Sequence, residues 1–524
     1  TSPADHAIIT AYTGGPLPHD PEDVAPEVDP TVPSNIFTAT EFVYSGDDPI
    51  QTGVAPATIV PERTAVIRGR VLTREGNPLP GVTVSVHSHT EYGQTLSRID
   101  GMFDLVVNGG GLLRVLYEKD GFMPVHRQLE VPWQQFSQAP DVRLIPRDPQ
   151  ATLINLAAPD PIQVARGSEV SDDDGTRQAT LLFPQGTVAE VVLPGGGTVQ
   201  FSVLNVRATE YTVGPGGPEA MPAEMPDGIG YTYAVEFTVD EAEAAGATSV
   251  NFSTPVINYV ENFLGFPIGS VVPVAYYDKD QGAWVPSANG QVIQILDVNG
   301  DIAEIDTDGD GQADDGGSLG ITDAERGQLA ALYATGQSLW RVALSHFTPI
   351  DYNWPVGPPP GATPPDQPPP EVDPLDDDPC PEWGSIIECQ NQVLRKTAHV
   401  TGTPFSLNYA SDRVPGRVVS RTLQIPVSGA TVPDSLKRIE LRIDVAGRIF
   451  EVELPAEPDQ AYTFEWDGLD AYGRPIQGSQ PVSVFIGYVY DAVYQQVPPE
   501  LAQSFGIPTA VPLDIPAREE MTLW

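Results

Sequence analysis

One stretch of this chain carries residue types and spacing that suit the binding of a hard cation. The run DTDGDGQAD, residues 306–314, alternates aspartate with small or polar residues. Alternating carboxylates can surround Ca²⁺ with oxygen atoms, and the glycine at the sixth position allows the sharp turn that such loops need. We therefore expect a Ca²⁺ ion whose ligands come from Asp306, Asp308, Asp310, Gln312 (through its backbone carbonyl) and Asp314.

The loop departs from the EF-hand pattern at its twelfth position, where Gly317 replaces the bidentate glutamate. It is more similar to the shorter Ca²⁺ loops of secreted bacterial proteins, with Asp315 or Asp323 completing the ligand set. A solvated acidic turn is the alternative. Two elements should position the loop: a strand before it, and after it a helix opened by a capping box with Thr322 as N-cap and Glu325 three residues later.

A second group of residues could carry chemistry on its own peptide bond. His346, Phe347 and Thr348 follow the apolar run LWRVAL. The hydroxyl of Thr348 could attack the Phe347 carbonyl in an N-to-O acyl shift, with His346 helping the proton transfer. The residues resemble the cleavage point of self-cleaving relatives of the ankyrin-type sandwich. They equally suit an ordinary final strand, and we expect the bond to stay intact. We find no other catalytic motif and predict that the protein is not an enzyme.

Composition narrows the class of protein. A chain of 524 residues is too long for one core, and its 55 Pro and 49 Gly separate short β-branched runs, which favours several all-β domains. The formal net charge of −44 disfavours nucleic-acid binding and fits cation binding, basic partners, a saline setting or solubility alone. No apolar run approaches the ~20 residues of a membrane span. Cys380 and Cys389 are a candidate disulfide of a secreted protein.

The amino-terminal third divides into an arm and a sandwich. Residues 1–62 are rich in Pro and Asp, so they are disordered or lie as an extended arm across a neighbouring domain. The segment NIFTATEFVY, residues 35–44, carries aromatic and branched side chains that an arm packed on a domain would bury. Turns recur about every ten residues in 63–148, as in a seven-strand sandwich. GRVLTREGNPLPGVTVSV in this segment resembles transthyretin-like, carboxypeptidase-regulatory domains, and HTEYGQTLSRIDGMFDL and PWQQF resemble the corresponding teneurin domain.

The middle of the chain predicts another β-domain and a spacer. RGSEVSDDDGTRQATLLFPQGTVAEV resembles the sandwich of ankyrins and netrin receptors, and VPVAYYDKDQGAWVPS predicts a pair of strands. We therefore expect one inserted β-sandwich with the Ca-type loop over residues 149–353. Residues 354–379 are dominated by proline and aspartate and predict a stiff, solvated linker.

Residues 380–524 contain the most regular strand pattern. Ile439, Leu441, Ile443 and Val445 alternate with charged residues, and the chain reverses at Ala446-Gly447, which predicts a hairpin with one dry face. GTPFSLNYASDRVPGR, VAGRIFEVELPAEPDQAYTFEWDGLDAYGRPIQG and VSVFIGYVY resemble the fibronectin-like plug domain of teneurins and teneurin-like RHS/YD-repeat proteins. Aromatic residues beyond the needs of one small core predict a plug surface formed by Tyr462, Tyr472, Tyr488, Tyr490 and Tyr494.

These observations predict an all-β multidomain chain of β-sandwiches (transthyretin-like, inserted and fibronectin-like plug) with a Pro-rich linker. The resemblance implies a non-catalytic structural part of a bacterial-type RHS/YD-repeat protein, which plugs and supports a β-shell of the same polypeptide. Such a shell often houses a toxic carboxy-terminal polypeptide. The alternative is a secreted or cell-surface adhesion module with a cell-surface or protein partner. Both imply an extracellular location, secreted or at the cell surface.

Overall fold

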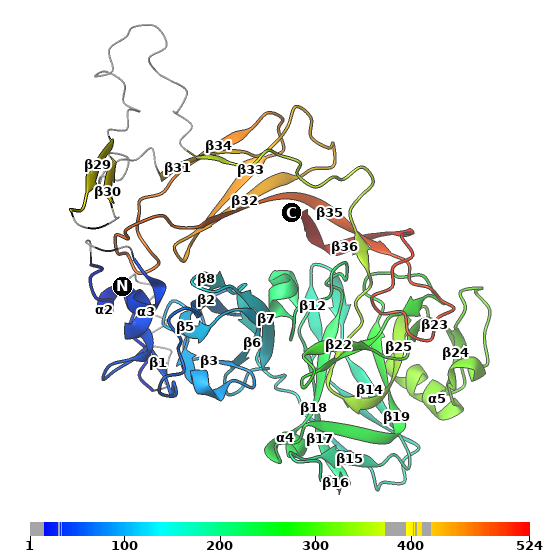
Figure 1. Ribbon diagram of the computed structural model, residues 1–524. Helices are drawn as coiled ribbons and strands as arrows, with labels where there is room; N and C mark the ends of the chain where they lie inside the picture. The colour runs from blue at the N-terminus through cyan, green and yellow to red at the C-terminus, as the bar shows by residue number, and fades with distance from the viewer. Residues whose placement is uncertain are drawn as a thin grey trace. The chain divides into compact units, whose positions relative to one another are not determined.

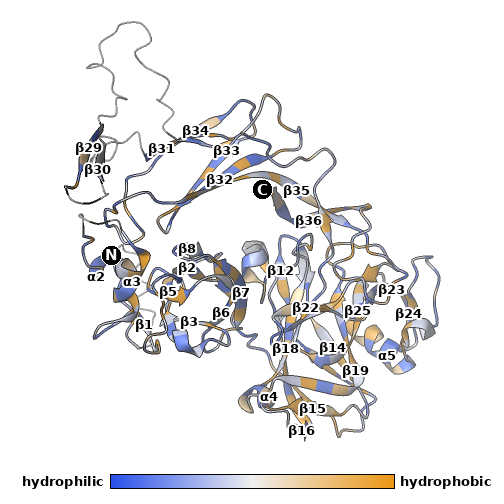
Figure 2. Ribbon diagram, in the orientation of Figure 1, coloured by the Kyte–Doolittle hydropathy of each residue, from blue (hydrophilic) through white to orange (hydrophobic). Residues whose placement is uncertain are grey.

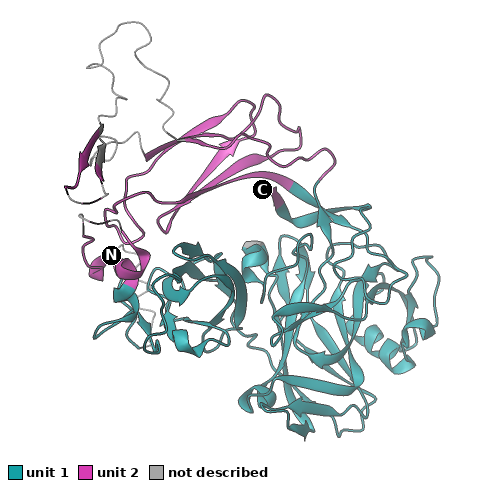
Figure 3. Cartoon of the chain, in the orientation of Figure 1, with its two compact units in different colours: residues 1–20, 41–358, 491–520 teal, residues 21–40, 359–490, 521–524 magenta. Residues whose placement is uncertain are grey.

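The computed structural model describes residues 15–29, 32, 34–372, 395–401, 403, 406–410 and 421–524. These residues form mostly β-strands in several sheets, which confirms the all-β, multidomain prediction. The chain divides into two compact units (Figure 3). Unit 1 comprises Thr1–Asp20, Glu41–Pro358 and Asp491–Glu520; unit 2 comprises Pro21–Thr40, Pro359–Tyr490 and Met521–Trp524.

The first part of unit 1 is a sandwich of two sheets (Figure 1). Phe103 and Tyr117 join the sheets in an edge-to-face contact with ring centroids 5.7 Å apart. Gly101 closes a turn with φ +79°, and a Cβ there would lie 2.4 Å from the Val71 carbonyl oxygen, so only glycine fits. The five-stranded sheet has the order β1 (Gln51–Thr52), β4 (Gln94–Leu96), β3 (Thr83–Val86), β6 (Gly111–Glu118), β7 (Val125–Val131), and the other sheet joins β5 (Met102–Asn108), β2 (Thr64–Thr73) and β8 (Phe136–Gln138), with β9 (Val142–Leu144) also pairing with β2.

A second, larger sandwich follows in unit 1. One sheet has six strands in the order β10 (Thr152–Asn155), β17 (Val203–Glu210), β18 (Ala234–Val239), β26 (Pro349–Asp351), β21 (Ala275–Asp278), β22 (Ala283–Pro286). The other follows β11 (Ile162–Arg166), β14 (Thr180–Pro184), β19 (Ser249–Glu261), β25 (Ser338–Phe347), β23 (Gly290–Asn299), β20 (Val271–Val272), with β15 (Ala189–Val192), β16 (Thr198–Phe201) and β24 (Ile302–Asp306) attached. Phe237 and Phe347 meet between the two sheets with ring centroids 5.4 Å apart.

Short elements complete this sandwich. The strands β12 (Val170–Asp172) and β13 (Gly175–Arg177) form a hairpin. Its helices are α4 (Asp240–Ala244) and α5 (Asp323–Leu332), and 3₁₀ segments lie at Gly214–Ala220 and Gly317–Leu319; a further 3₁₀ turn, Thr90–Tyr92, belongs to the first sandwich.

Arginine side chains tie the two sandwiches of unit 1 together. Arg127 is buried and donates to the carbonyl oxygens of Met221 (3.0 Å) and Glu219 (2.9 Å). Arg114 donates to the carbonyl of Lys279 at 2.7 Å. Hydrogen bonds from a charged donor are among the stronger ones, so these contacts favour a fixed arrangement of the two sandwiches.

Residues 491–520, which the sequence analysis places with the plug, pack within unit 1. Arg518 binds Asp172 (3.1 Å), Asp174 (2.6 Å) and the carbonyl of Thr232 (2.7 Å). The neighbouring Glu519 accepts the Tyr231 N–H at 2.6 Å, and burial raises its pKa to about 7. A two-residue strand, β27 (Val356–Gly357), pairs with Tyr494 and Val493.

Unit 2 contains the predicted hairpin. Four apolar residues of β32 (Arg438–Val445) are buried while the charged residues between them are partly exposed, and the alternation is visible in Figure 2. The turn at Ala446-Gly447 leads into β33 (Arg448–Pro455) in the expected register. The remaining strands are β28 (Glu371–Val372), β29 (Arg395–His399), β30 (Ser406–Ala410), β31 (Thr422–Pro426), β34 (Ala461–Glu465), β35 (Val482–Gln495) and β36 (Pro512–Leu523), the last two of which continue into or from unit 1.

The predicted arm is partly helical and part of it lies within unit 2. It forms α2 (Pro21–Val24) and α3 (Ile36–Tyr44), and Asn35 caps α3 by accepting the Phe37 N–H at 2.8 Å. Ser34 exchanges two hydrogen bonds with Gln477, at 3.0 and 2.9 Å. The arm therefore docks on the long loop between β34 and β35.

Candidate functional site

The aspartate loop lies between β24 and α5. Asp306 ends the strand and is only 2% exposed. Its Oδ1 accepts the Gly309 N–H at 2.7 Å and its Oδ2 accepts the Gly311 N–H at 2.9 Å. Both glycines have positive φ, +84° and +77°, which turns their amides toward this carboxylate. The loop thus folds around the first aspartate of the motif.

Asp314 closes the loop from the other end. Its N–H donates to the Ile305 carbonyl at 2.7 Å, and its Oδ2 accepts both the N–H (2.7 Å) and the hydroxyl (2.6 Å) of Thr307. Hydrogen bonds to the ionised carboxylate stabilise it, so they lower the pKa of Asp314. The side chain is therefore ionised at neutral pH.

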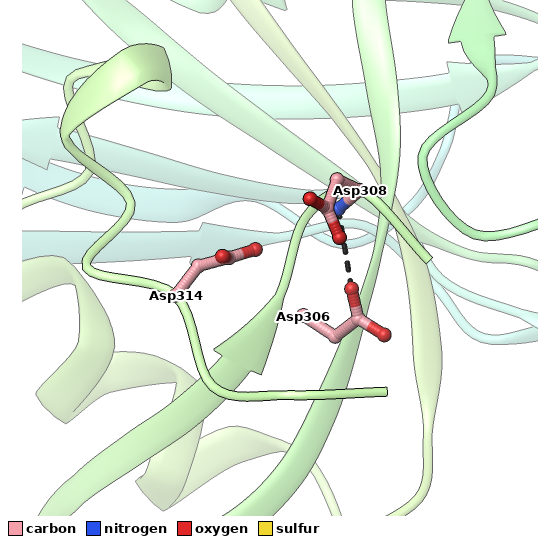
Figure 4. Close-up of side chains that lie close together, drawn as sticks. All are labelled: Asp306, Asp308 and Asp314. Carbon is pink, nitrogen blue, oxygen red and sulfur yellow. Dashed lines mark hydrogen bonds between the residues drawn. The ribbon is translucent and has the colours of Figure 1, made fainter. Parts of the chain in front are cut away.

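Three of the predicted ligands come together (Figure 4). One carboxylate oxygen from each of Asp306, Asp308 and Asp314 lies within 4.8 Å of the others. Calcium binds oxygen at about 2.3–2.6 Å, so oxygens up to about 5 Å apart can share one ion. The three carboxylates therefore fit Ca²⁺ in spacing and in charge.

The other predicted ligands have different partners. Asp310 binds Gln312 instead, accepting its N–H at 2.8 Å and its side-chain amide at 2.9 Å. Asp315 accepts the Gly317 N–H at 2.8 Å, and Asp323 lies 3.5 Å from Arg326. The partial ligand set leaves open positions that water or a small rearrangement of Asp310 would have to fill.

The helix after the loop begins as predicted, but one half of the capping box is absent. The Thr322 hydroxyl accepts the Glu325 N–H at 3.2 Å. The Glu325 side chain is buried and accepts hydrogen bonds from Tyr259 (2.7 Å) and Arg341 (2.8 Å). These partners lie on β19 and β25, so Glu325 anchors α5 to the nine-stranded sheet. Sequence reasoning missed this role because both partners are distant in the chain.

His346, Phe347 and Thr348 lie where the chain leaves one sheet for the other. The Thr348 hydroxyl is 3.3 Å from His346 Nδ1, and burial lowers the pKa of His346, which favours the neutral imidazole. Phe347 is 4% exposed and packs against Phe183, Phe237 and Phe252. Within the described residues, no cis peptide bond occurs and these three residues have no positive φ. A proton acceptor is thus in place, but the backbone shows no strain there.

The predicted tyrosine surface is wrong for four of its five members. Tyr472, Tyr488, Tyr490 and Tyr494 are between 0 and 3% exposed, and Tyr462 packs at the edge of the unit 2 core. Their hydroxyls find distant partners: Tyr488 donates to the Val427 carbonyl (3.2 Å) and Tyr490 to that of Thr363 (2.7 Å). They are core residues with a satisfied polar tip.

One further prediction concerns the two cysteines. Cys380 and Cys389 lie outside the described residues, so the candidate disulfide stays a prediction. Asp467 and Asp470 form a structured turn: Asp467 pairs with Arg448 at 2.6 Å, and Asp470 with Arg474 at 2.8 Å.

Comparisons with known proteins match two separate parts of this chain. Residues 59–144 match the family described as the teneurin TTR-like domain, and residues 422–500 match the teneurin 1-4 FN-plug domain. Both segments are teneurin-like. They cover the first sandwich of unit 1 except β1, and all of the strands β31 to β35, and together they make up less than half of the chain.

Individual teneurins align with parts of this chain. Teneurin-3 of Mus musculus is 31% identical over 180 residues, which is 34% of this chain and 6% of that protein. Teneurin-1 of Homo sapiens is 33% identical over 152 residues, and teneurin-m of Drosophila melanogaster is 39% identical over 106 residues. The alignments cover 4–6% of these three proteins. Among the described residues, no helix has the length and apolarity that crossing a membrane requires.

Proposed function

We propose that this chain is a non-catalytic, structural part of an RHS/YD-repeat protein of the bacterial type. In this proposal the fibronectin-like region plugs and supports a β-shell formed by YD repeats of the same polypeptide. The observation that supports it most directly is the pair of teneurin-like segments, with the TTR-like segment before the FN-plug segment. A shell of this kind would enclose a toxic carboxy-terminal polypeptide.

The contact face of the plug would be the outer face of its main sheet. Phe485 and Ile449 lie on that face, opposite the buried side chains of β32, and are 44% and 39% exposed. Arg442 lies over the Phe485 ring at 5.7 Å. Trp524, 60% exposed, sits above Gly487, where a Cβ would be 2.8 Å from its ring. Apolar rings bordered by charged groups are typical of protein contacts.

The aspartate loop would hold a structural Ca²⁺ ion. With Asp306, Asp308 and Asp314 this close together, the carboxylates repel one another unless a cation neutralises them. An ion there would fix the connection between β24 and α5. It would supply no chemistry to a substrate, in keeping with a non-catalytic role.

Hydrogen exchange tests the plug. We expect amides of β33 and β35 to be better protected in the natural polypeptide with its repeats than in residues 1–524 alone. A Phe485→Glu change should abolish that difference, because it places a charge in the contact. Leu153→Glu is the matched control, since Leu153 is 63% exposed and lies in unit 1. Equal protection in both forms would refute a plug–shell contact.

The second candidate is a secreted or cell-surface adhesion module. The same exposed apolar face, together with the net charge of −44, would then meet a basic protein partner on a cell surface. Two results together would favour this candidate. Residues 1–524 should bind intact cells and lose that binding in Phe485→Glu, and the repeats should not change the amide protection. Either role belongs outside the cell, and we propose a secreted or cell-surface location.

A further inference from the structure

A cleft of about 520 Å³ opens in the larger sandwich of unit 1. It lies where the chain crosses from β25 to β26. From Pro349 onward, β26 fills the space between β18 and β21; before Pro349 that space is open and forms the cleft. The first turn of α4 and the start of β19 complete its lining. Pockets of roughly 300–1,000 Å³ hold small organic ligands, so this volume suffices for one or two sugar rings.

Four of the five charged side chains that line the cleft are already paired, and the fifth, Asp280, is exposed. Glu236 accepts hydrogen bonds from Lys279 at 3.0 Å and from the Tyr211 hydroxyl at 2.5 Å. Glu243 pairs with Arg147 at 2.8 Å. Asp278 accepts the N–H groups of the following turn. An anion would meet an excess of carboxylates, while a cation would find every lining carboxylate except the exposed Asp280 already paired. The lining therefore favours an uncharged ligand.

Several uncharged polar groups of the cleft lack a partner. The residue Thr238 is only 7% exposed, and its buried hydroxyl makes no hydrogen bond within the described residues. The side chains of Asn251 and Tyr276 also make none there. A buried hydroxyl without a hydrogen-bond partner is unfavourable, so a ligand or water should bind to it.

An aromatic ring adds an apolar surface to these groups. The Tyr276 ring is partly exposed and is held edge-to-face against His346, with ring centroids 4.6 Å apart. Burial keeps His346 neutral, so the imidazole can both donate and accept. A ring face next to hydroxyl, amide and imidazole groups matches a molecule with many hydroxyls on an apolar carbon frame.

We propose that this cleft binds a neutral saccharide of one or two rings. Thr238, Asn251 and His346 would hydrogen-bond its hydroxyls, and Tyr276 would pack against its C–H face. The proposal is independent of the plug function, because every residue that lines the cleft belongs to unit 1.

Saturation-transfer NMR on the whole chain tests this with a panel of neutral monosaccharides and their β-linked disaccharides. At least one member should show transfer, and Thr238→Val should weaken its binding about tenfold, because about 1.4 kcal/mol of hydrogen bonding is lost. Asn251→Ala should weaken it by a similar factor. Valine keeps the shape of threonine, so Thr238→Val should not lower the unfolding temperature.

The matched control is Ser137→Ala in β8. Ser137 also carries a buried hydroxyl without a partner among the described residues, but it lies outside the cleft. This change should leave saccharide binding untouched. Any of three results would overturn the proposal: no saccharide shows transfer, Thr238→Val binds as well as the unchanged protein, or Ser137→Ala loses as much binding as Thr238→Val. Binding of oligolysine in place of saccharides would also overturn it, because the acidic rim would then dominate.

Discussion

Arg474 should be one of the most costly single positions in unit 2. Its guanidinium is buried (8% exposed) and binds Asp470 at 2.8 Å, the Pro26 carbonyl at 3.1 Å and the Ala39 carbonyl at 2.9 Å. Arg474→Leu removes all three contacts. It leaves the buried, charged Asp470 without the guanidinium that neutralises it. Breaking a buried pair in this way costs about 3–5 kcal/mol. At that cost the docked arm should open roughly 150 to 5,000 times more often.

Hydrogen exchange of the arm amides, residues 34–40, measures this opening directly. Arg448→Leu is the control, because its pair with Asp467 is 32% and 47% exposed and is worth only about 0–1 kcal/mol. Adding Asp470→Asn to Arg474→Leu should restore part of the protection, since the asparagine keeps the acceptor for the Tyr472 N–H without the charge. Similar exchange in Arg474→Leu and Arg448→Leu would show that the guanidinium does not hold the arm.

Three other predictions follow from single groups. Burial raises the pKa of Asp351, whose Oδ2 has no partner among the described residues. The folded state keeps this proton above the unfolded pKa of about 3.9, so stability falls as pH rises from there toward the raised pKa, and Asp351→Asn should flatten that fall in urea-unfolding experiments. Calorimetric titration should detect Ca²⁺ binding that Asp308→Ala abolishes and Asp323→Ala preserves, and unchanged heat with and without chelator would contradict the site. Mass spectrometry should find the Phe347–Thr348 bond intact, and two fragments that disappear in Thr348→Ala would show self-cleavage.

The sequence predicted best those features that depend on neighbouring residues. The alternation of Ile439 to Val445 required only a strand period of two, and the Thr322 cap required only the next turn of helix. The aspartate motif likewise brought Asp306, Asp308 and Asp314 together through hydrogen bonds within a few residues. Local chemistry determines these features, so it could be read without the fold.

Features that depend on distant segments could not be read in this way. The tyrosines of β35 were expected at a surface because they exceed the needs of one small core, but their partners include Thr363, 127 residues away, and Tyr231, 263 residues away. Glu325 was predicted to cap the helix, but its carboxylate instead accepts hydrogen bonds from Arg341 and Tyr259. Asp310 shows that local contacts can also mislead: it was predicted as a Ca²⁺ ligand, but the side-chain amide of its neighbour Gln312 donates to its carboxylate.

The division of unit 1 among separated stretches has a consequence for synthesis on the ribosome. Glu519 accepts the Tyr231 N–H from 288 positions further along the chain. At about 5–20 residues per second, Tyr231 waits roughly 15–60 s for that partner. All of the described part of unit 2 except Met521–Trp524 emerges in or before that interval. A nascent chain therefore carries an unfinished first unit while the second can already fold, and a chaperone that shields the neighbourhood of Tyr231 would act during this window.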